Sequence, residues 1–322
     1  MGKDYVIGID GGGTYTRVVI ADLEGNVAGA FTGGGSHPGK NKDAKTNVQH
    51  AVLEAVKQAG KDISVKYIVG GFAGLDQPED QHWADDFLNI DGINAPFSAV
   101  NDAEIAQYGA FLGKSGIVAV AGTGSNILGR TENGRIVKEG NFHHKSKAGA
   151  RHLSYSVIYD IITAKSFIKE DEQFIHSILE HLDLKNVSEL RKFASDGFYA
   201  DYFMTMKKLS KMGRIVTDEA HMGNKIAISA CRKAANSLTT GILLVSSVFS
   251  EEKVPFTLIG SVATNSFIAN VIMEELEKRD IFKELVYQPP KLRPEMGAVL
   301  KAYHRLGLKI TEEVINKLEK PQ

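Results

Sequence analysis

Cysteine, tryptophan and proline are scarce in this chain of 322 residues, which contains one, one and eight of them. The single cysteine, Cys231, excludes an internal disulfide and an all-cysteine metal site within one chain. It lies in the stretch KIAISACRKAANSL, which has a helical pattern. We therefore expect Cys231 to be a small buried core residue.

The chain also lacks an excess of charge and long apolar runs. Its formal net charge of −1 excludes a basic field that would hold nucleic acid or an anionic membrane. No apolar run reaches the ~18 residues of a membrane span, and the run near the N-terminus is too short for a signal peptide. We expect a cytoplasmic protein that acts on a small molecule, with neither nucleic acid nor a membrane as partner.

Strand and helix patterns alternate along the first third of the chain. Three short strands joined by tight turns predict a meander over residues 5–10, 16–21 and 27–32. The following patterns predict helices at 43–59, 78–88 and 103–112 between strands at 66–71 and 96–100. This alternation is typical of an α/β sheet with helices on both faces.

The same pattern then starts again. Strands are predicted at 116–121, 126–130 and 135–139, so strand, Gly/Thr turn, strand, polar turn and strand occur twice. Residues 148–249 are largely helical, followed by strands at 255–260 and 284–287 and helices at 265–278, 294–306 and 310–318. We interpret this as an internal duplication, with a hinge near 108–115 and a second crossing near 289–294. The predicted domains are 1–112, and 113–293 with a helical insertion.

Two glycine-rich turns carry the chemistry. Asp10-Gly-Gly-Gly-Thr14 joins two strands, and its backbone N–H groups can converge on an anion while Thr14 adds a hydroxyl. It matches neither a P-loop nor a dinucleotide fingerprint, since both of those open a helix. The second turn, Gly122-Thr-Gly-Ser125, has the same setting, and two such turns can grip a polyphosphate. A carboxylate at Asp10 beside a triphosphate implies an intervening Mg²⁺, held in part through water.

Asn101-Asp102 follows a strand and begins a helix. One interpretation is that Asp102 is a simple capping residue. The other is that Asp102 is a general base that takes the proton of a substrate hydroxyl during attack on a γ-phosphate.

At these motifs the chain resembles a known family. Asp-Gly-Gly-Gly-Thr at 10–14, Asn-Asp-Ala at 101–103, Ala-Gly-Thr-Gly-Ser-Asn at 121–126 and Pro-Glu-Met-Gly-Ala at 294–298 stand in the order seen in N-acetylglucosamine kinases of the BadF/BadG/BcrA/BcrD-type ATPases. The resemblance covers residues 4–305. It implies an α/β fold of two ribonuclease H-like (actin-like ATPase) domains with a central nucleotide cleft, and a helix at 294–322 that packs back on the first domain.

The resemblance also implies a site. ATP and Mg²⁺ are the expected cofactors, and an amino sugar is the expected partner: N-acetylglucosamine, N-acetylmuramic acid or glucosamine. Asp102 is the expected base, and the expected ATP phosphate-binding residues are Gly11, Gly12, Gly13, Thr14, Gly122, Thr123, Gly124 and Ser125. The adenosine loop is expected at Gly260 and Ser261. The expected substrate-binding residues are Ser36, His37, Gly74, Asn101, Asp102, Asn126 and Arg151. A homodimer is left open.

The sequence departs from the family pattern where the sugar should bind. The tryptophan and both acidic residues usual after the second hairpin are missing from residues 143–155, and Lys145, Lys147 and Arg151 bring positive charge instead. One hypothesis is a substrate with an acidic group bound by Arg151. The alternatives are a solvated basic loop, or a degenerate kinase that acts as a non-catalytic sensor of sugar or nucleotide. One cysteine per chain excludes the iron–sulfur activators of the wider family.

Overall fold

The structure is a computed structural model that describes residues 3–60, 63–279 and 282–320. It has the predicted α/β architecture, with two five-stranded sheets. The chain divides into two compact units. The first comprises the chain up to Val118, Leu128–Ile136 and the chain from Tyr287 onward, and the second comprises Ala119–Ile127 and Val137–Val286.

The first sheet has the strand order β3-β2-β1-β4-β5. Strands β1 and β2 are antiparallel, as are β2 and β3, which confirms the predicted meander. Strand β4 is parallel to both β1 and β5. The bounds are β1 Asp4–Gly11, β2 Tyr15–Asp22, β3 Val27–Gly34, β4 Ser64–Phe72 and β5 Phe97–Asn101.

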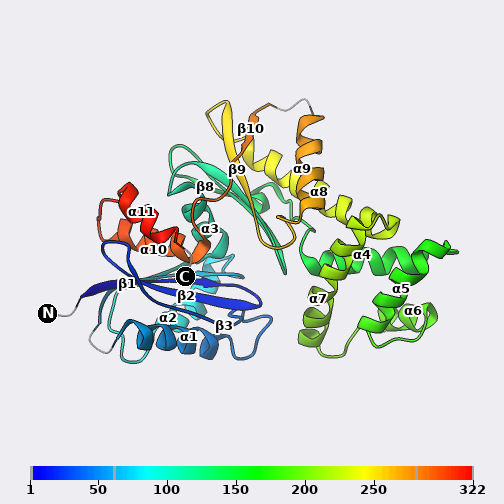
Figure 1. Ribbon diagram of the computed structural model, residues 1–322, viewed down its shortest axis with the longest axis horizontal. Helices are drawn as coiled ribbons and strands as arrows, with labels where there is room; N and C mark the ends of the chain where they lie inside the picture. The colour runs from blue at the N-terminus through cyan, green and yellow to red at the C-terminus, as the bar shows by residue number, and fades with distance from the viewer. Residues whose placement is uncertain (1–2, 61–62, 280–281, 321–322) are drawn as a thin grey trace. The chain divides into compact units, whose positions relative to one another are not determined.

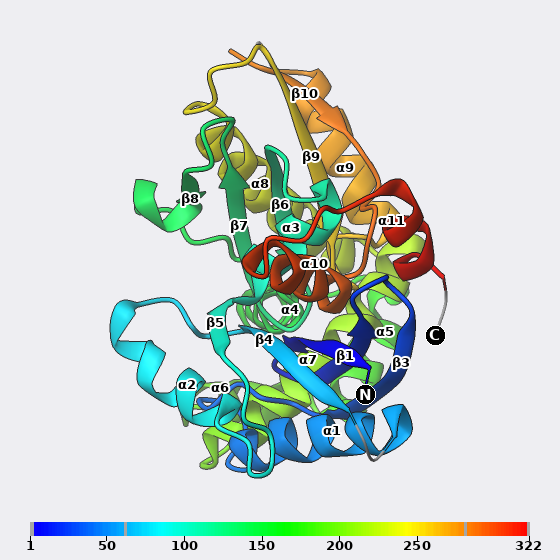
Figure 2. The ribbon, with the colours of Figure 1, turned by 90° about the vertical axis from the view of Figure 1, so that its left-hand side faces the viewer.

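Helices cover both faces of this sheet, with α1 on one side and α10 on the other in Figures 1 and 2. Successive side chains of β1 point to opposite faces, so Ile7 packs with the α1 and α2 side while Val6 packs with the α3, α10 and α11 side. The bounds are α1 Ala44–Ala59, η1 Pro78–Asp80, α2 Gln81–Leu88, α3 Asp102–Phe111, α10 Pro294–Arg305 and α11 Glu312–Leu318.

Helix α10 approaches the sheet and α3 closely because glycines line its contacts. A Cβ at Gly8 of β1 would lie 2.4 Å from the carbonyl oxygen of Glu295, and a Cβ at Gly297 would lie 2.1 Å from the carbonyl oxygen of Ile105. These glycines are therefore required for packing rather than for binding a ligand.

The second sheet repeats the topology of the first. Its order, β10-β9-β6-β7-β8, is the first sheet's order with each strand replaced by its counterpart in the second half of the chain. The internal duplication predicted from the sequence is thereby confirmed. The bounds are β6 Gly116–Ala121, β7 Ser125–Arg130, β8 Ile136–Lys138, η2 Glu139–Phe142, β9 Lys253–Ile259 and β10 Glu284–Tyr287.

The predicted helical insertion follows η2. Its longest helix, α8, buries Ala230, Ala234, Leu238 and Ile242 along one stripe, and Cys231 is fully buried beside them, as expected. Burial raises the pKa of the Cys231 thiol to about 12. The bounds of the helices in this region are α4 Ala150–Thr163, α5 Lys169–His181, α6 Val187–Ser195, α7 Tyr202–His221 and α8 Lys225–Ser246. A further helix, α9 Ser266–Glu277, lies between β9 and β10.

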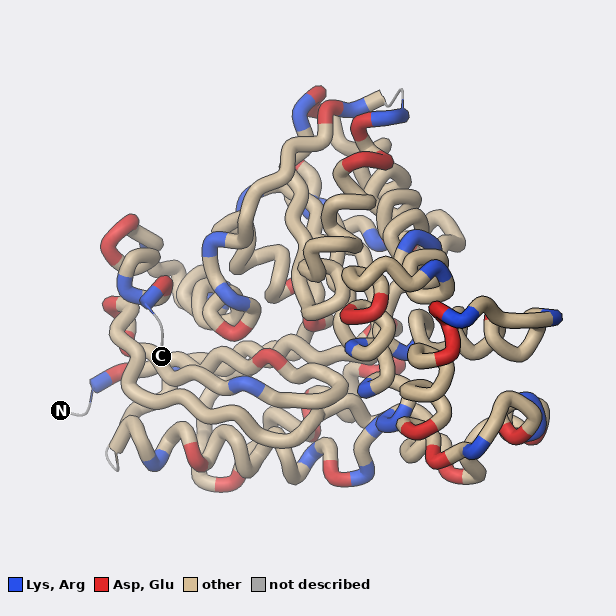
Figure 3. The backbone as a smooth tube through the Cα atoms, turned by 45° about the vertical axis from the view of Figure 1, so that its right-hand side comes forward, with Lys and Arg blue, Asp and Glu red and all other residues tan. Residues whose placement is uncertain are grey.

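Residues of both charge signs are interspersed along the helices and loops (Figure 3). Within the described part of the chain, no helix combines the length and the apolar character needed to cross a bilayer.

Candidate active site

The first glycine turn lies at the carboxyl edge of the parallel strands. Gly11, Phe72 and Asn101 are paired across β1, β4 and β5, so the loops that follow these strands start side by side. In open α/β sheets this edge is where ligands bind.

Neighbouring loops hold the first turn in place. The N–H of Gly12 donates to the carbonyl of Tyr15 at 2.9 Å, and the N–H of Ser36 donates to the carbonyl of Gly12 at 3.0 Å. A Cβ at Gly11 would lie 2.5 Å from the Ser36 hydroxyl oxygen. The structure thus brings Ser36, a predicted substrate residue, against the predicted phosphate turn.

Asp10 lies just before this turn and is buried. Its Oδ2 accepts a hydrogen bond from Arg17 at 3.1 Å, across the β1–β2 hairpin. Burial raises the pKa of the Asp10 carboxyl to about 7, with the negative charges of Glu295 and Asp102 adding to the rise and Arg17 opposing it. The sequence interpretation missed Arg17 and Glu295. The β1–β2 hairpin register, which pairs Arg17 with Asp10, is the signal for Arg17, and Glu295 stands inside the Pro-Glu-Met-Gly-Ala motif at 294–298.

Asn101, rather than Asp102, caps helix α3. The Oδ1 of Asn101 accepts from the N–H of Ala103 at 3.0 Å, and its Nδ2 donates to the carboxylate of Asp76 at 3.0 Å. Asp102 is the first residue of the helix, is half-buried, and its Oδ1 accepts from the same N–H at 2.9 Å. The capping interpretation therefore applies to Asn101.

His37 and Gly74 meet in the loops beyond β3 and β4. Gly74 has φ of +90°, and a Cβ there would lie 2.9 Å from Nε2 of His37. The N–H of Gly39 donates to Nδ1 of His37 at 3.1 Å, which fixes the ring. Together with Ser36, Asn101 and Asp102, these predicted substrate residues all belong to the first unit.

The second glycine turn, between β6 and β7, lies at the N-terminus of α4. The N–H of Ala150 donates to the carbonyl of Gly122 at 2.8 Å. A Cβ at Gly149 would lie 2.6 Å from both the Cα of Gly124 and the carbonyl oxygen of Thr123. A Cβ at Gly122, by contrast, would meet no described atom of its own unit within 4 Å, apart from its chain neighbours.

The predicted adenosine loop packs directly against this turn. The N–H groups of Val262 and Ala263 donate to the carbonyl of Ala121 at 2.9 and 3.1 Å. Gly260 has φ of +94°, and a Cβ there would lie 2.5 Å from the same carbonyl oxygen, while Ser261 is exposed. Two segments that are about 140 residues apart thus form one continuous surface of the second unit.

Ser125 and Arg151 have protein partners. The Ser125 hydroxyl donates to the carbonyl of Ser146 at 2.6 Å, and Asn126 follows it in β7. Arg151 lies in the first turn of α4, where its Nη1 donates to the sulfur of Met206 at 3.4 Å. It is half-buried on a helix, whereas Lys145 and Lys147 are exposed in the loop before that helix, so the interpretation as a solvated loop fits the two lysines but not Arg151. Tyr155 and Tyr159, four residues apart on α4, stack with ring centroids 5.9 Å apart.

A family model supplies the identification. The model of the BadF/BadG/BcrA/BcrD ATPase family matches residues 7–302. The chain belongs to this ATPase family. The chain is also 30% identical over 297 residues to the N-acetylmuramic acid/N-acetylglucosamine kinase of Clostridium acetobutylicum, covering 89% of this chain and 93% of that protein. It is 25% identical over 326 residues to the N-acetyl-D-glucosamine kinase of Dictyostelium discoideum, covering 94% and 98%.

Solved structures agree on the fold. A protein described as a putative N-acetylglucosamine kinase from Chromobacterium violaceum aligns with a TM-score of 0.71 at 18% identity, over 93% of this chain and 98% of that one. A ROK family glucokinase from Streptomyces griseus aligns with a TM-score of 0.59 at 18% identity, over 92% and 98%. The BadF/BadG/BcrA/BcrD ATPase described here therefore has the two-domain, actin-like ATPase fold of sugar kinases.

Proposed function

We propose that this ATPase family member is an ATP-dependent kinase that phosphorylates a hydroxyl of an amino sugar. The observation that carries the proposal is the position of Asp102. It lies at the carboxyl edge of the first sheet, close enough to Asp10 to raise the pKa of the Asp10 carboxyl. The N-cap of helix α3 is Asn101, not Asp102. The amino-sugar kinases among its relatives support the substrate class.

Each predicted residue has a role in this proposal. Both glycine turns bind phosphates of ATP, through Gly11, Gly12, Gly13 and Thr14 in the first unit and Gly122, Thr123, Gly124 and Ser125 in the second. Gly260 and Ser261 pass beneath the adenosine. Asp102 orients the sugar hydroxyl and accepts its proton as that oxygen attacks the γ-phosphorus in line with the leaving ADP. Ser36, His37, Gly74, Asn101, Asn126 and Arg151 bind the sugar.

The charge around Asp10 fits a divalent cation. Three carboxylates, those of Asp10, Asp102 and Glu295, interact there, and the nearest compensating charge on Asp10 is Arg17. Among the described residues, no three acidic, histidine or cysteine side chains are arranged to hold a metal by themselves. Asp10 would therefore hold Mg²⁺ together with phosphate and water oxygens. When bound, Mg²⁺ neutralises negative charge on the β- and γ-phosphates.

Arg151 favours an amino sugar with an acidic group. Its guanidinium is held on α4 by Met206, and that helix begins at the second phosphate turn. A planar guanidinium recognises a carboxylate through two parallel hydrogen bonds. The Clostridium relative, named for N-acetylmuramic acid as well as N-acetylglucosamine, is consistent with such a substrate.

A substrate screen tests the proposal. Consumption of ATP would be measured with amino sugars, muramic acid derivatives and neutral hexoses, with a sample without sugar as control. We expect consumption with amino sugars that well exceeds the control. ATP consumption that no sugar increases would refute the kinase and favour the sensor.

Replacing Arg151 with Met should lower kcat/KM for N-acetylmuramic acid about 10- to 100-fold relative to N-acetylglucosamine, the range for one charge-assisted contact. Equal losses for both sugars would contradict the role of Arg151.

A further inference from the structure

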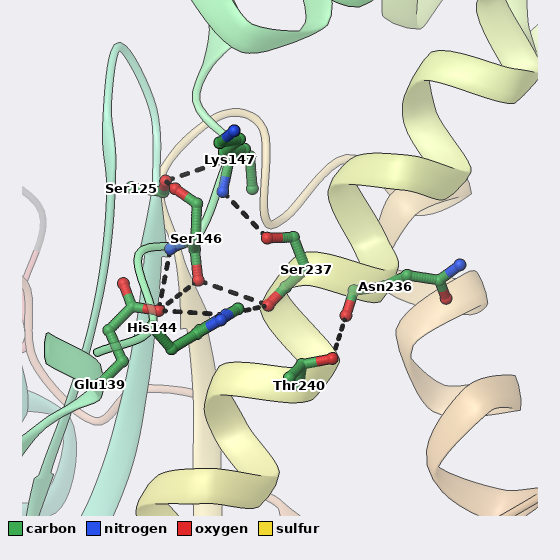
Figure 4. A network of polar contacts seen from close by, with 9 residues as sticks. Ser125, Glu139, His144, Ser146, Lys147, Asn236, Ser237 and Thr240 are labelled. Atoms are coloured by element: carbon green, nitrogen blue, oxygen red, sulfur yellow. Dashed lines mark hydrogen bonds and ion pairs between the residues drawn. The ribbon is translucent and has the colours of Figure 1, made fainter. Parts of the chain in front are cut away.

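A buried carboxylate outside the proposed reaction, that of Glu139, lies behind the second phosphate turn. Glu139 is 4% exposed and begins the short helix η2 after β8. Its Oε2 accepts hydrogen bonds from the N–H and the hydroxyl of Ser146, at 3.0 and 2.5 Å. The Nε2 of His144 lies 3.6 Å from the same oxygen. Figure 4 shows the side chains of Glu139, His144 and Ser146 pointing toward one another.

Helix α8 closes this network from the other side. The carbonyl of Ser237 lies 3.1 Å from Nε2 of His144, and the Ser237 hydroxyl accepts from the N–H of Lys147 at 2.9 Å. The helix can approach because residue 241 is glycine. A Cβ there would lie 2.9 Å from Oε2 of Glu139 and 2.3 Å from Cδ1 of Ile127.

The network ends at the phosphate turn. The carbonyl of Ser146 accepts from the hydroxyl of Ser125, which is the last residue of the turn and the first of β7, at 2.6 Å. The N–H of Ala148 donates back to the Ser125 oxygen at 3.3 Å. Residues 144–148 have no regular secondary structure, so side-chain hydrogen bonds rather than a helix or a strand fix their path. Glu139 is thereby connected, through Ser146, to the backbone that leaves the turn.

We infer that Glu139 is a positioning residue that sets the conformation of the second phosphate turn, and so the affinity for nucleotide, without touching the nucleotide. This inference rests on the proposed function, because it takes residues 122–125 to bind phosphate. Burial raises the pKa of the Glu139 carboxyl, while the Ser146 hydrogen bonds and the charge of His144 oppose the rise. Removing this carboxylate takes the acceptor away from the buried N–H of Ser146, which is costly, so the segment that Glu139 anchors should be disturbed.

The test compares nucleotide affinity with sugar affinity in purified full-length variants. Glu139→Ala removes the acceptor, Glu139→Gln keeps one oxygen acceptor of the same shape, and Glu180→Ala removes an exposed carboxylate elsewhere in the second unit as the matched control. The dissociation constant of ADP would be measured by calorimetry without sugar, and the KM values of ATP and sugar by a coupled assay. The thermal midpoint would be recorded for each variant.

We expect Glu139→Ala to raise both the dissociation constant of ADP and the KM of ATP by about 10- to 100-fold. This is the range expected for loss of a buried charged hydrogen bond. The KM of the sugar should stay within about threefold, and Glu139→Gln should recover most of the affinity. If Glu139→Ala does not fold, Ser146→Ala serves in its place, since it removes only the hydroxyl partner. A folded variant that is less stable but binds ADP like the wild type would overturn the inference, as would an equal rise in both KM values.

Failure of the inference can be told apart from failure of the proposed function. ADP binding requires no sugar, so a wild-type protein that binds ADP but phosphorylates no sugar refutes the kinase proposal alone. In that case a weaker ADP affinity in Glu139→Ala still supports the positioning role.

Discussion

Replacing Gly122 with alanine separates a glycine needed by a ligand from one needed by the fold. The φ of Gly122 lies outside the left-handed region, and its added methyl group would meet no described atom of its own unit within 4 Å beyond the chain neighbours. Nothing in that unit therefore requires glycine there. If a phosphate lies against this backbone, the methyl group occupies its place.

The two expected effects have opposite signs. An unstrained Gly→Ala change stabilises a protein by about 0.4–1 kcal/mol, because the unfolded chain has less conformational freedom to lose. Loss of one or two charge-assisted hydrogen bonds to phosphate costs about 1.5–3 kcal/mol each, so the affinity for ATP should fall by at least about tenfold. Gly122→Ala should thus have an unchanged or slightly higher thermal midpoint and a much higher KM for ATP.

Thermal unfolding and nucleotide titration measure the two effects on the same protein. Gly140→Ala is the matched control, because Gly140 is exposed, has a Cβ position equally open, and lies outside the proposed site. It should leave both quantities near their wild-type values. If Gly122→Ala binds ATP as the wild type does, residues 122–125 do not bind phosphate and the proposed nucleotide site is refuted.

Three further predictions test other parts of the site. Asp102→Asn keeps an oxygen that can accept from Ala103, so it should fold normally and lose ~10²–10⁴-fold in turnover; an unchanged rate would exclude Asp102 as the base. Because the folded pKa of Asp10 is raised to about 7 from 3.8, the unfolding free energy of the wild type relative to Asp10→Asn should fall as pH rises from about 4 to about 7, by at most about 4 kcal/mol. Chemical denaturation across that range would show it, and a constant difference would contradict the raised pKa. Gly260→Ala should lower the thermal midpoint more than Gly307→Ala, which shares the positive φ but has open space for a Cβ; equal losses would show that contact with Ala121 contributes nothing.

The fold could be predicted because local signals and topology agree. The boundaries of β6 and β10 match the sequence interpretation, and the other strands and the α-helices outside residues 148–249 differ by a few residues at most. Within 148–249 the sequence predicted helical content but not the bounds of α4 to α8. The duplication was visible because a glycine/threonine turn between two strands repeats after about 110 residues. Both copies then take the same strand order, since a meander with two further strands on one side builds the same sheet twice.

The positions of the supporting residues could not be predicted in the same way. Glu139 and Ser237 are joined by the hydroxyl of Ser146, which contacts both, and Ser146 and Ser237 lie 91 positions apart in the chain. Nothing in the local sequence around Glu139 or Ser237 distinguishes them from surface residues. The sequence interpretation offered Asp102 as the cap of α3, but the sequence does not tell which of the two adjacent polar residues, Asn101 or Asp102, leaves the strand with extended backbone. Asn101 does so, with ψ of 145°. Tertiary packing decides both cases.

Glycine is the residue whose meaning depends most on the structure. The sequence singles out Gly122 but does not separate a packing role from a binding role for Gly8, Gly122, Gly149 and Gly297. Three of them, Gly8, Gly149 and Gly297, lie so close to another backbone that a Cβ would clash. Gly8 and Gly297 bring α10 onto the sheet and onto α3, and Gly149 lets α4 begin against the second turn. Only Gly122 of these four has space around it, in a turn that contacts the start of α4 and residues 260–263. A rigid turn with one open glycine is what close approach of a phosphate requires, and for this reason the change at Gly122 tests the site more directly than a change at any of the packed glycines.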